Sequence, residues 1–295
     1  MDYQWYPGHM TKARRMMQEN IQLIDLLIEL TDARAPQAGR NPDIDTLAKG
    51  KSRIVVLNKA DLADPDATKK WCGFFEENGF LTARIDSRKG SGVRQLKPLI
   101  DKACAEKIER NKRRGIVNRP VRAMIAGIPN VGKSTFINSF AGRAAARTGD
   151  KPGVTKGKQW IRLNKNVELL DTPGILWPKF DDQEIGKKLA LIGSIRDEIT
   201  DAQELAVWLI RYLEKEYPDV LENRYQLSQT QDRDDVPALS KDEENIDQAV
   251  KILGQIAWRR GCLKAGGEAD PEKAAKTLID DFRSGRLGNI TLEKV

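Results

Sequence analysis

The stretch "GIPNVGKS", residues 127–134, decides which fold this chain is expected to have. It fits the pattern G-x-x-x-x-G-K-S and follows "VRAMIAG" (121–127), an apolar run typical of a buried strand. Gly127 and Gly132 carry no Cβ, so the backbone N–H groups of the loop can turn inward around phosphate oxygens. The alternative is an ordinary turn with a solvated lysine. A strand before the loop and a helix after it favour a phosphate-binding loop.

Individual residues of this loop have different expected tasks on a nucleoside triphosphate. Lys133 would reach the β- and γ-phosphates as a point charge and is a predicted catalytic residue. Ser134 would offer its hydroxyl to Mg²⁺. The nucleotide contacts expected from the loop are those of Asn130, Val131, Gly132, Lys133, Ser134 and Thr135.

The later stretch "LLDTPG" (169–174) would complete the phosphate end of the site. Asp171 comes at the end of a predicted strand, where its carboxylate can hold Mg²⁺ through water. The N–H of Gly174 can meet the γ-phosphate. Alone, "DTPG" is a common turn sequence. Its position downstream of the phosphate loop favours the functional interpretation.

A threonine between these two stretches would act as a switch that closes on the metal. The segment "GDKPGVTKG" (149–157) contains Thr155, which we expect to complete the metal sphere when triphosphate is bound and to act in catalysis. Thr148 is the competing choice. The predicted metal ligands are therefore Ser134, Thr155 and Asp171.

Upstream of all these, "IVVLNKAD" (54–61) has the pattern of a guanine reader. The Asp61 carboxylate can accept hydrogen bonds from guanine N1–H and N2–H₂, which adenine does not offer in this arrangement. Asn58 can address the other edge of the base, and the Lys59 stem can lie along the ring face. Ala60 completes the predicted base loop.

A second loop would support the base. The stretch "RIDSRKG" (84–90) ends a predicted strand, and Asp86–Ser87 could present a backbone N–H to guanine O6. A bare N-K-x-D pattern is common by chance. An apolar strand before it and "DS" after the next strand favour a functional site.

The order of these elements is unusual, because the base reader precedes the phosphate loop. The order is a cyclic shift of the common one, and circular permutation is tolerated where the chain ends lie close together at the surface. The stretch "NKRRGIVNRP" (111–120) would be the connection that joins the old ends.

Alternating strands and helices predict an α/β doubly wound sheet. The predicted strands are "LLIEL" (26–30), "RIVVLN" (53–58), "VRAMIAG" (121–127) and "VELLD" (167–171). The predicted helices lie near residues 10–24, 42–49, 66–78 and 92–110.

After about residue 180 the pattern becomes helical. One helix would begin after Asp201 and end at Pro218, and another would begin after Asp270 with Pro271 at its first position. A third covers 244–260, and 226–240 is expected to be a connecting loop. We therefore predict a permuted P-loop nucleotide-binding domain over 1–178, N-terminal helix included, and a small all-helical C-terminal domain over 179–295.

The charge of the chain favours a polyanionic partner. The net charge is +7 and the pI is about 9.2. Basic residues gather in 12–15 and 102–122, where they suit phosphate-backbone contacts, although a solvated helix surface is the alternative. The three cysteines are far apart in the sequence, and no apolar run approaches membrane-spanning length. These features predict a cytoplasmic protein.

Taken together, the motifs resemble those of the circularly permuted GTPases, and within them the bacterial ribosome biogenesis GTPase A family. The resemblance covers nearly the whole chain and is carried by "WYPGHMTKARR", "TDARAP", "LNKAD", "GIPNVGKSTFIN", "DTPGILWPKF" and "RRGCLKAGGEAD…DFRSGRLG". It implies hydrolysis of GTP to GDP and phosphate with Mg²⁺. It also implies a role in late maturation of the large (50S) ribosomal subunit, stimulation by that subunit, and rRNA and ribosomal proteins as partners. The helical C-terminal domain would contact the ribosome. The protein would be a monomer in solution and would not bind membranes.

The resemblance leaves the catalytic step open. Ras-like proteins carry a glutamine after the D-x-x-G glycine, whereas this chain has Ile175, which cannot orient water. His9 is a predicted catalytic residue that could orient water, with a structural cap or an RNA contact as its alternative. Asn130 could help hold a K⁺ near the phosphates, or it could merely stabilise the loop.

The sequence leaves two alternatives to an assembly factor. One is a signalling switch with a protein target, in which the basic surface is incidental. The other is a GTP-independent RNA-binding protein with a degenerate nucleotide site. The intact "GKS", "DTPG" and "NKAD" argue against the latter.

Overall fold

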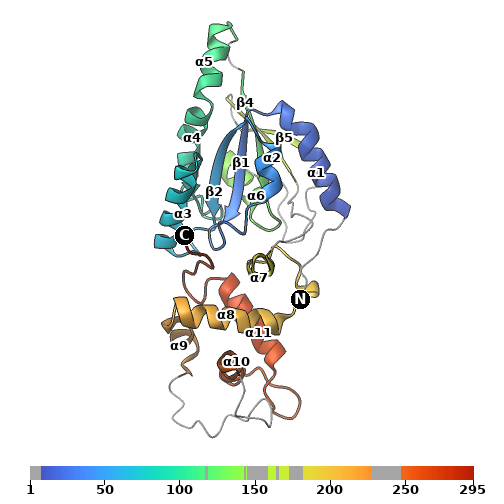
Figure 1. The fold of residues 1–295 in the computed structure, drawn as a ribbon, viewed down its shortest axis with the longest axis vertical. Coiled ribbons are helices and arrows are strands. Elements are labelled where there is room, and N and C mark those ends of the chain that lie inside the picture. Colours follow the sequence, from blue (N-terminus) through green and yellow to red (C-terminus); the bar gives the residue numbers. More distant parts are fainter. Residues whose placement is uncertain are drawn as a thin grey trace.

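The computed structural model describes residues 8–116, 119–142, 144, 159–163, 166–172, 182–227 and 247–295. It gives only the backbone of residues 8–10, 12, 13, 159 and 171. Figure 1 shows a sheet flanked by helices, standing above a second group of helices, here called the helical group. This arrangement confirms the predicted α/β sheet followed by a helical part.

In the described part of the chain, six strands form one sheet in the order β3-β2-β1-β4-β6-β5. Neighbouring strands are parallel, except that β5 runs antiparallel to β6. The phosphate loop leaves the end of β4, in the middle of the sheet, with β1 on one side and β6 on the other. The strands are β1 (Leu26–Asp32), β2 (Ser52–Asn58), β3 (Leu81–Arg84), β4 (Val121–Gly127), β5 (Gln159–Arg162) and β6 (Val167–Asp171).

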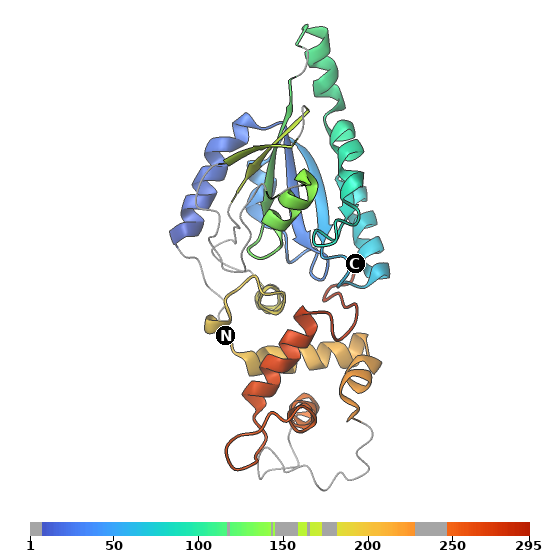
Figure 2. The same ribbon diagram turned by 180° about the vertical axis from the view of Figure 1, so that it is seen from behind.

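Helices cover both faces of this sheet because successive strand residues point to opposite sides. Leu27 and Met124 pack in a cluster with residues of α1 and α2, whereas Ile28 and Ile125 pack with residues of α4 and α6. Figure 1 shows α2 in front of the sheet, and Figure 2 shows α6 in front when the molecule is seen from behind. The helices are α1 (Gly8–Asn20), α2 (Pro42–Leu47), α3 (Pro65–Glu77), α4 (Leu96–Ala103) and α6 (Lys133–Ala141).

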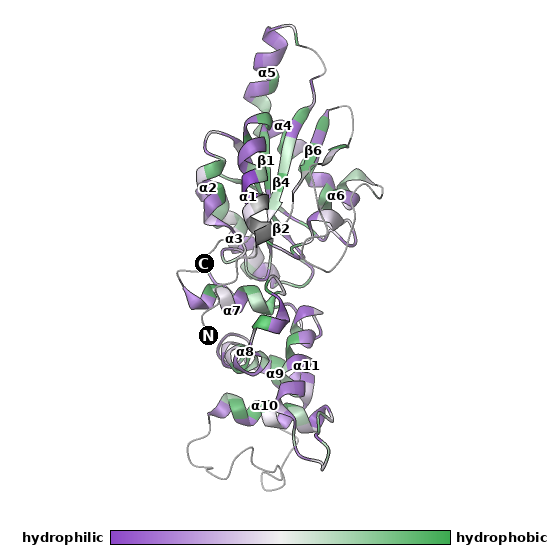
Figure 3. Ribbon diagram, turned by 90° about the vertical axis from the view of Figure 1, so that its right-hand side faces the viewer, coloured by the Kyte–Doolittle hydropathy of each residue, from purple (hydrophilic) through white to green (hydrophobic). Residues whose placement is uncertain are grey.

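One helix projects away from the sheet. Helix α5 (Ala105–Arg113) buries none of its residues. It extends past the sheet at the end opposite the helical group, and its ribbon is mostly hydrophilic in Figure 3. The prediction of a single helix over 92–110 was wrong, because the chain forms a 3₁₀ turn at Val93–Gln95 and then α4 and α5. The break falls at buried Cys104, whose φ of −108° and ψ of 9° depart from helical values.

The helical group confirms two predicted caps. The Asp201 side chain accepts hydrogen bonds from two backbone N–H groups at the start of α8, and Asp270 accepts one at the start of α11. Pro271 is the first residue of α11, as predicted. The helices of this group are α7 (Gln183–Leu191), α8 (Ala202–Glu216), α9 (Asp219–Tyr225), α10 (Gln248–Arg259) and α11 (Pro271–Arg283).

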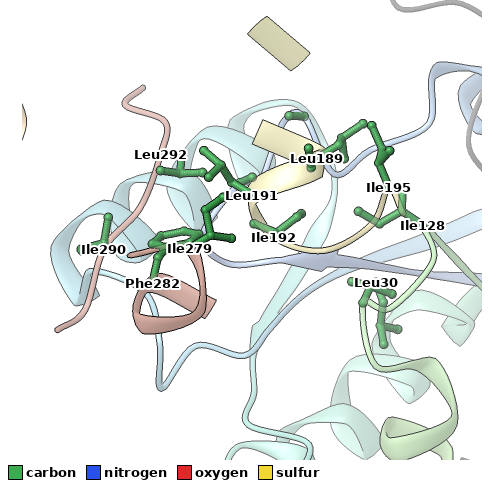
Figure 4. Close-up of a cluster of buried hydrophobic side chains, with 14 of the residues drawn as sticks. Leu30, Ile128, Leu189, Leu191, Ile192, Ile195, Ile279, Phe282, Ile290 and Leu292 are labelled. Carbon is green, nitrogen blue, oxygen red and sulfur yellow. The ribbon is translucent and has the colours of Figure 1, made fainter. Parts of the chain in front are cut away.

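Helices α7 and α11 pack against the edge of the sheet where the parallel strands end. Figure 4 shows Leu30 and Ile128 from this edge near side chains of α7, α11 and the C-terminal tail. The tail, residues 285–295, then returns to the sheet. Its Leu292 N–H donates to the Arg34 carbonyl at 2.7 Å, and its Ile290 N–H donates to the Leu62 carbonyl at 3.2 Å. The helical group and the carboxyl edge of the sheet thus share one apolar core.

Some elements were not predicted from the sequence, namely β5, α7 and α9. The predicted loop over 226–240 lies mostly outside the described residues. The predicted boundary at 178/179 also lies outside them, so the division into two domains stays a prediction. None of the helices in the described ranges combines the length and apolar character needed to cross a membrane.

Candidate active site

The phosphate loop has the backbone shape that its glycines were expected to allow. Gly127 has a φ of 156°, and a Cβ there would lie 2.5 Å from the Leu30 carbonyl oxygen. Gly132 has a φ of 99°, and a Cβ there would lie 2.6 Å from Nδ2 of Asn58. Both glycines are therefore required where the loop passes close to neighbouring strands. Helix α6 begins directly after Gly132 and directs its free backbone N–H groups into the loop, which suits an anion.

Lys133 lies within this loop rather than in solvent. Its Nζ donates to the carbonyl oxygens of Gly127 at 3.1 Å and Ile128 at 2.8 Å, and the residue is 8% exposed. A buried ammonium held by loop carbonyls lies where phosphate oxygens would approach. Ser134 and Thr135 follow in the first turn of α6 and are partly exposed.

Asn58 joins the base reader to both neighbouring loops. Its Nδ2 donates to the Val131 carbonyl at 2.8 Å, and its Oδ1 accepts from the Ser87 hydroxyl at 2.8 Å and the Ser87 N–H at 3.2 Å. The residue is 2% exposed. The structure thus brings the predicted base and phosphate residues together at one edge. The predicted contact of Asn58 with the base itself stays a prediction.

Lys59 is held by a buried carboxylate that the sequence analysis did not single out. Its Nζ lies 2.9 Å from Oδ2 of Asp32, and its φ is 58°, a left-handed conformation. Arg34 binds the same carboxylate through Nε at 2.9 Å and Nη2 at 2.8 Å. Burial alone would raise the pKa of Asp32, but Arg34 and Lys59 outweigh it and hold that pKa well below its usual range.

Asp61 is open to a ligand. It is exposed, and its carboxylate has no hydrogen-bond partner among the described residues. The loop that carries it is fixed by the backbone, since the Ala60 N–H donates to the Ile85 carbonyl at 3.1 Å. A fixed loop with a free carboxylate suits recognition of the guanine N1 and N2 donors.

Asp86 shapes the second base loop. Its Oδ1 accepts from the N–H groups of Arg88 at 2.8 Å and Lys89 at 3.1 Å, and it is 6% exposed. The Asp86 N–H donates to the Ser91 carbonyl, and the Ser87 N–H donates to Asn58. These N–H groups have protein acceptors in this structure, so the predicted bond to guanine O6 stays a prediction.

Known proteins resemble this chain over its full length. A family model described as a 50S ribosome-binding GTPase matches residues 122–241. Ribosome biogenesis GTPase A of Bacillus licheniformis is 45% identical over 294 residues, which cover 100% of this chain and 99% of that protein. The chain belongs to the ribosome biogenesis GTPase A family.

A more distant relative and two solved structures are also similar to this chain. The protein of that name from Thermotoga maritima is 32% identical over 290 residues, covering 98% of this chain and 94% of the relative. A crystal structure of GNP-bound YlqF from T. maritima is 27% identical, covers 96% of this chain and 98% of that one, and has a TM-score of 0.62. A GDP-bound YlqF structure has a TM-score of 0.63 at 26% identity, covering 95% of this chain and 99% of that one.

These findings establish what the site does at a coarse level. The chain is a GTPase of ribosome biogenesis that binds guanine nucleotide and hydrolyses GTP to GDP and phosphate. Its domain is a circularly permuted P-loop GTPase fold followed by a helical C-terminal part, as predicted. Individual residue roles remain the predictions given above.

Several predicted site residues lie outside the part of the chain that the structure describes. They are Thr148, Thr155, Gly174 and Ile175, together with the side chains of His9 and Asp171. Beside Asp171, the Thr172 hydroxyl donates to the Ile125 carbonyl at 2.5 Å. This bond ties the end of β6 to β4, next to the strand end that leads into the phosphate loop.

Asn130 contacts the helical group. It has a φ of 58°, and its Nδ2 donates to the Gly193 carbonyl at 2.8 Å. The hydroxyl of Ser194 donates to the Pro129 carbonyl at 2.9 Å. The phosphate loop is therefore bonded to the segment after α7, and a role of Asn130 in holding K⁺ stays a prediction.

Sequence reasoning missed Asp32, Arg34 and the tail residue Asn289. Asn289 Nδ2 donates to the carbonyls of Asp61 at 3.2 Å and Ala63 at 3.0 Å. Asp32 and Arg34 belong to the family motif "TDARAP", and the position of this motif at the end of the strand beside β2 was the available signal. Nothing local in "LGNITLEKV" indicates that the tail supports the base loop.

Proposed function

We propose that this GTPase assists late maturation of the large (50S) ribosomal subunit, docking on its rRNA and hydrolysing GTP faster when docked. The observation that carries the proposal is a basic helix that projects from an intact guanine nucleotide domain. Ribosomal proteins beside the rRNA site would complete the contact, and the protein would act as a monomer. The protein would act in the cytoplasm, where the ribosomal subunits are.

The proposed rRNA surface comprises the last turn of α4, α5 and the residues that follow α5. Six basic residues here are exposed, and five of them have no acidic partner among the described residues, since Arg113 pairs with Glu109. Exposed cations on a projecting helix suit the regularly spaced phosphates of RNA. The five are Lys102, Arg110, Lys112, Arg114 and Arg119.

Two other basic residues of the predicted set have partners within the fold. Lys107 forms an ion pair with buried Asp25, and Arg122 pairs with Glu168 at 3.3 Å and lies over the Trp160 ring. These two residues would support α5 and the sheet, and would contribute less to RNA binding than their charge suggests.

The nucleotide site would bind GTP together with Mg²⁺. Ser134, Thr155 and Asp171 would hold the metal, which neutralises charge on the β- and γ-phosphate oxygens when bound. Lys133 would bind the same phosphates from the protein side, and Asp61 would select guanine. The hydroxyl of Ser134 lies in the first turn of α6, beside the N–H groups expected to bind phosphate.

Subunit stimulation would compensate for the missing glutamine. With Ile175 unable to position water, intrinsic turnover would be slow, and contact with rRNA would bring His9 toward the γ-phosphate. In Figure 1 the start of α1 lies toward the same end of the sheet as α7, where the phosphate loop also lies. K⁺ beside Asn130 is the second proposed source of charge stabilisation.

The decisive measurement is the GTPase rate with and without purified large subunits. We expect strong acceleration, which His9→Ala loses while GTP affinity and docking are retained, because a group acting in the transition state leaves ground-state binding unchanged. If His9→Ala is stimulated like the native protein, exchange of K⁺ for Na⁺ tests the cation instead. No acceleration by large subunits would contradict the proposal.

Co-sedimentation with subunits across a salt series separates rRNA docking from a protein target. Docking through phosphates should weaken steeply as salt rises, and GTP analogues should strengthen it relative to GDP. A salt-insensitive interaction would favour the signalling switch, and equal docking with GTP analogue and GDP would break the link to nucleotide state.

A further inference from the structure

A buried ion cluster stands directly behind the base-recognition loop. Asp32 ends β1 and is 0% exposed, and it pairs in register with Asn58 at the end of β2. Its carboxylate binds Lys59 on one side and Arg34 on the other, while the Ala33 N–H donates to the Asn58 carbonyl at 2.8 Å. The backbone of Lys59 is in a conformation that non-glycine residues rarely adopt. Neighbouring contacts must therefore hold it there.

Arg34 connects this ion cluster to α11. Its Nη1 donates to the Arg283 carbonyl at 3.2 Å, at the end of α11. Its guanidinium carbon lies 5.2 Å from the centre of the Phe282 ring. The Arg34 carbonyl in turn accepts from the Leu292 N–H of the tail. Arg34 is 2% exposed, so all these contacts are made away from water.

The same helix end also reaches the phosphate loop. The Arg283 side chain donates to the carbonyls of Ala190 at 2.7 Å and Leu191 at 3.0 Å, at the end of α7. The carbonyl of Gly193, just beyond α7, accepts from Asn130 of the phosphate loop. Figure 4 shows apolar side chains of α7, α11 and the tail packed together at this place. Both nucleotide-binding loops are thus bonded to the helical group at its junction with the sheet.

We propose that Asp32 and Arg34 are positioning residues that couple the base-recognition loop to α11 and the tail. Through them, guanine nucleotide in the site and docking of the helical group stabilise each other. Arg34 provides the link because its planar fork can bind both Asp32 oxygens and still donate to Arg283. The inference requires guanine nucleotide binding alone and does not depend on the ribosomal subunit.

Thermodynamic linkage between GDP binding and docking of α11 can be tested by measuring both in the same variants. If docking of α11 raises the affinity for GDP, GDP must raise the stability of docking by the same factor. We compare native protein, Arg34→Lys and the control Arg40→Lys. Lysine keeps the charge beside Asp32 but cannot make the fork of bonds. Arg40 is a matched control, since it binds the carboxylate of Glu29 and lies 4.8 Å from the Phe80 ring centre.

Two quantities are measured on each full-length variant, without ribosomal subunits. The first is the GDP dissociation constant, which should rise about tenfold in Arg34→Lys, a typical allosteric factor, and less than about twofold in Arg40→Lys. The second is amide hydrogen exchange over residues 283–292, with and without saturating GDP. GDP should slow this exchange in the native protein and in Arg40→Lys but not in Arg34→Lys.

A merely structural role for Arg34 gives a different result. The variant would then melt at a lower temperature, yet GDP would still slow exchange over 283–292, and this outcome overturns the proposal. GDP affinity unchanged in Arg34→Lys also overturns it. If Arg34→Lys does not fold, Phe282→Leu removes the ring beside the guanidinium while keeping the core apolar. It should weaken GDP binding and the exchange response in the same direction, and no change in either would overturn the proposal.

Discussion

At the carboxyl edge of the sheet Arg34 is 2% exposed and binds Asp32, whereas α5 at the opposite end buries none of its residues. Arg110 and Lys112 of that helix are exposed and have no acidic partner among the described residues. Basic side chains thus form a fixed frame around the nucleotide loops and an open surface at the far end. The comparison shows that the role of a basic residue depends on its burial and its ion-pair partners, and cannot be deduced from the net charge of the chain.

The two regions should respond to substitution on different scales. Removing one partner of a buried ion pair leaves an uncompensated charge and costs about 3–5 kcal/mol. Removing an exposed charge usually changes stability by less than about 0.5 kcal/mol. Substitutions at the carboxyl edge should therefore change the stability of the fold and the rate of GTP hydrolysis. Substitutions in α5 should change only the binding of the ribosomal subunit.

The largest expected effect is on chemistry at the carboxyl edge. Lys133→Ala should lower GTP hydrolysis about a thousandfold while the protein stays folded, because the charge that meets the phosphates is lost. Steady-state phosphate release measures this, with the exposed Lys97→Ala as control. Hydrolysis near the native rate would mean that Lys133 is not catalytic.

Next in size is the stability effect of Asp32→Asn, about 3–5 kcal/mol at neutral pH, since Arg34 and Lys59 would lose their shared carboxylate. The folded-state pKa of Asp32 lies below its unfolded value, so this contribution is present above about pH 4 and is lost as the pH falls further. Urea unfolding at pH 7 and pH 3 measures it.

Asp45→Asn is the control for that experiment, because Asp45 pairs with Arg40 and Arg53 but its side chain is 52% exposed. We expect a cost below about 1 kcal/mol for this variant. Equal costs for Asp32→Asn and Asp45→Asn would remove the contrast between buried and exposed pairs.

Base selectivity comes third. Asp61→Asn should lose the pair of bonds to guanine N1 and N2 and shift preference toward xanthine nucleotides by about a hundredfold. Competition binding with GTP, ATP and XTP tests this, and the exposed Asp66→Asn serves as control. An unchanged preference for GTP in Asp61→Asn would rule out the assignment.

The smallest expected effect is at α5. A triple change of Arg110, Lys112 and Arg114 to Gln should leave stability and intrinsic GTPase rate unaltered. It should lower the salt slope of subunit docking by about 2–3, since each phosphate contact contributes about 0.7–0.9. Co-sedimentation measures the slope, with Lys69→Gln and Lys70→Gln together as control. An unchanged slope would exclude α5 from the rRNA contact.

Local patterns were sufficient to predict much of the fold. Apolar runs before "GIPNVGKS" and within "IVVLNKAD" identify β4 and β2, and both motifs depend on residues adjacent in sequence. The caps at Asp201 and Asp270 are likewise local signals, as the observed bonds confirm. Strand β5 was missed because "QWIR" is short and mixes polar with apolar residues.

The supports of the site could not be predicted in this way, because they join distant residues. Asp32 binds Lys59 only after β1 and β2 pair, and Arg34 meets Arg283 only after α11 packs against the sheet. The two polar atoms of Asn58 bind Val131 and Ser87, which are both distant from it in the sequence. Such contacts depend on tertiary packing, which sequence periodicity does not encode.

The tail that supports the base loop also bears on how the protein is made. Asn289 follows Asp61 by 228 residues. At translation rates of about 5–20 residues per second, the loop is synthesised roughly 10 to 50 seconds before Asn289 is added. During that interval the nascent chain has its guanine-reading strand but lacks the bonds to Asp61 and Ala63. The bonds that support the base loop can therefore form only after the helical group has been synthesised.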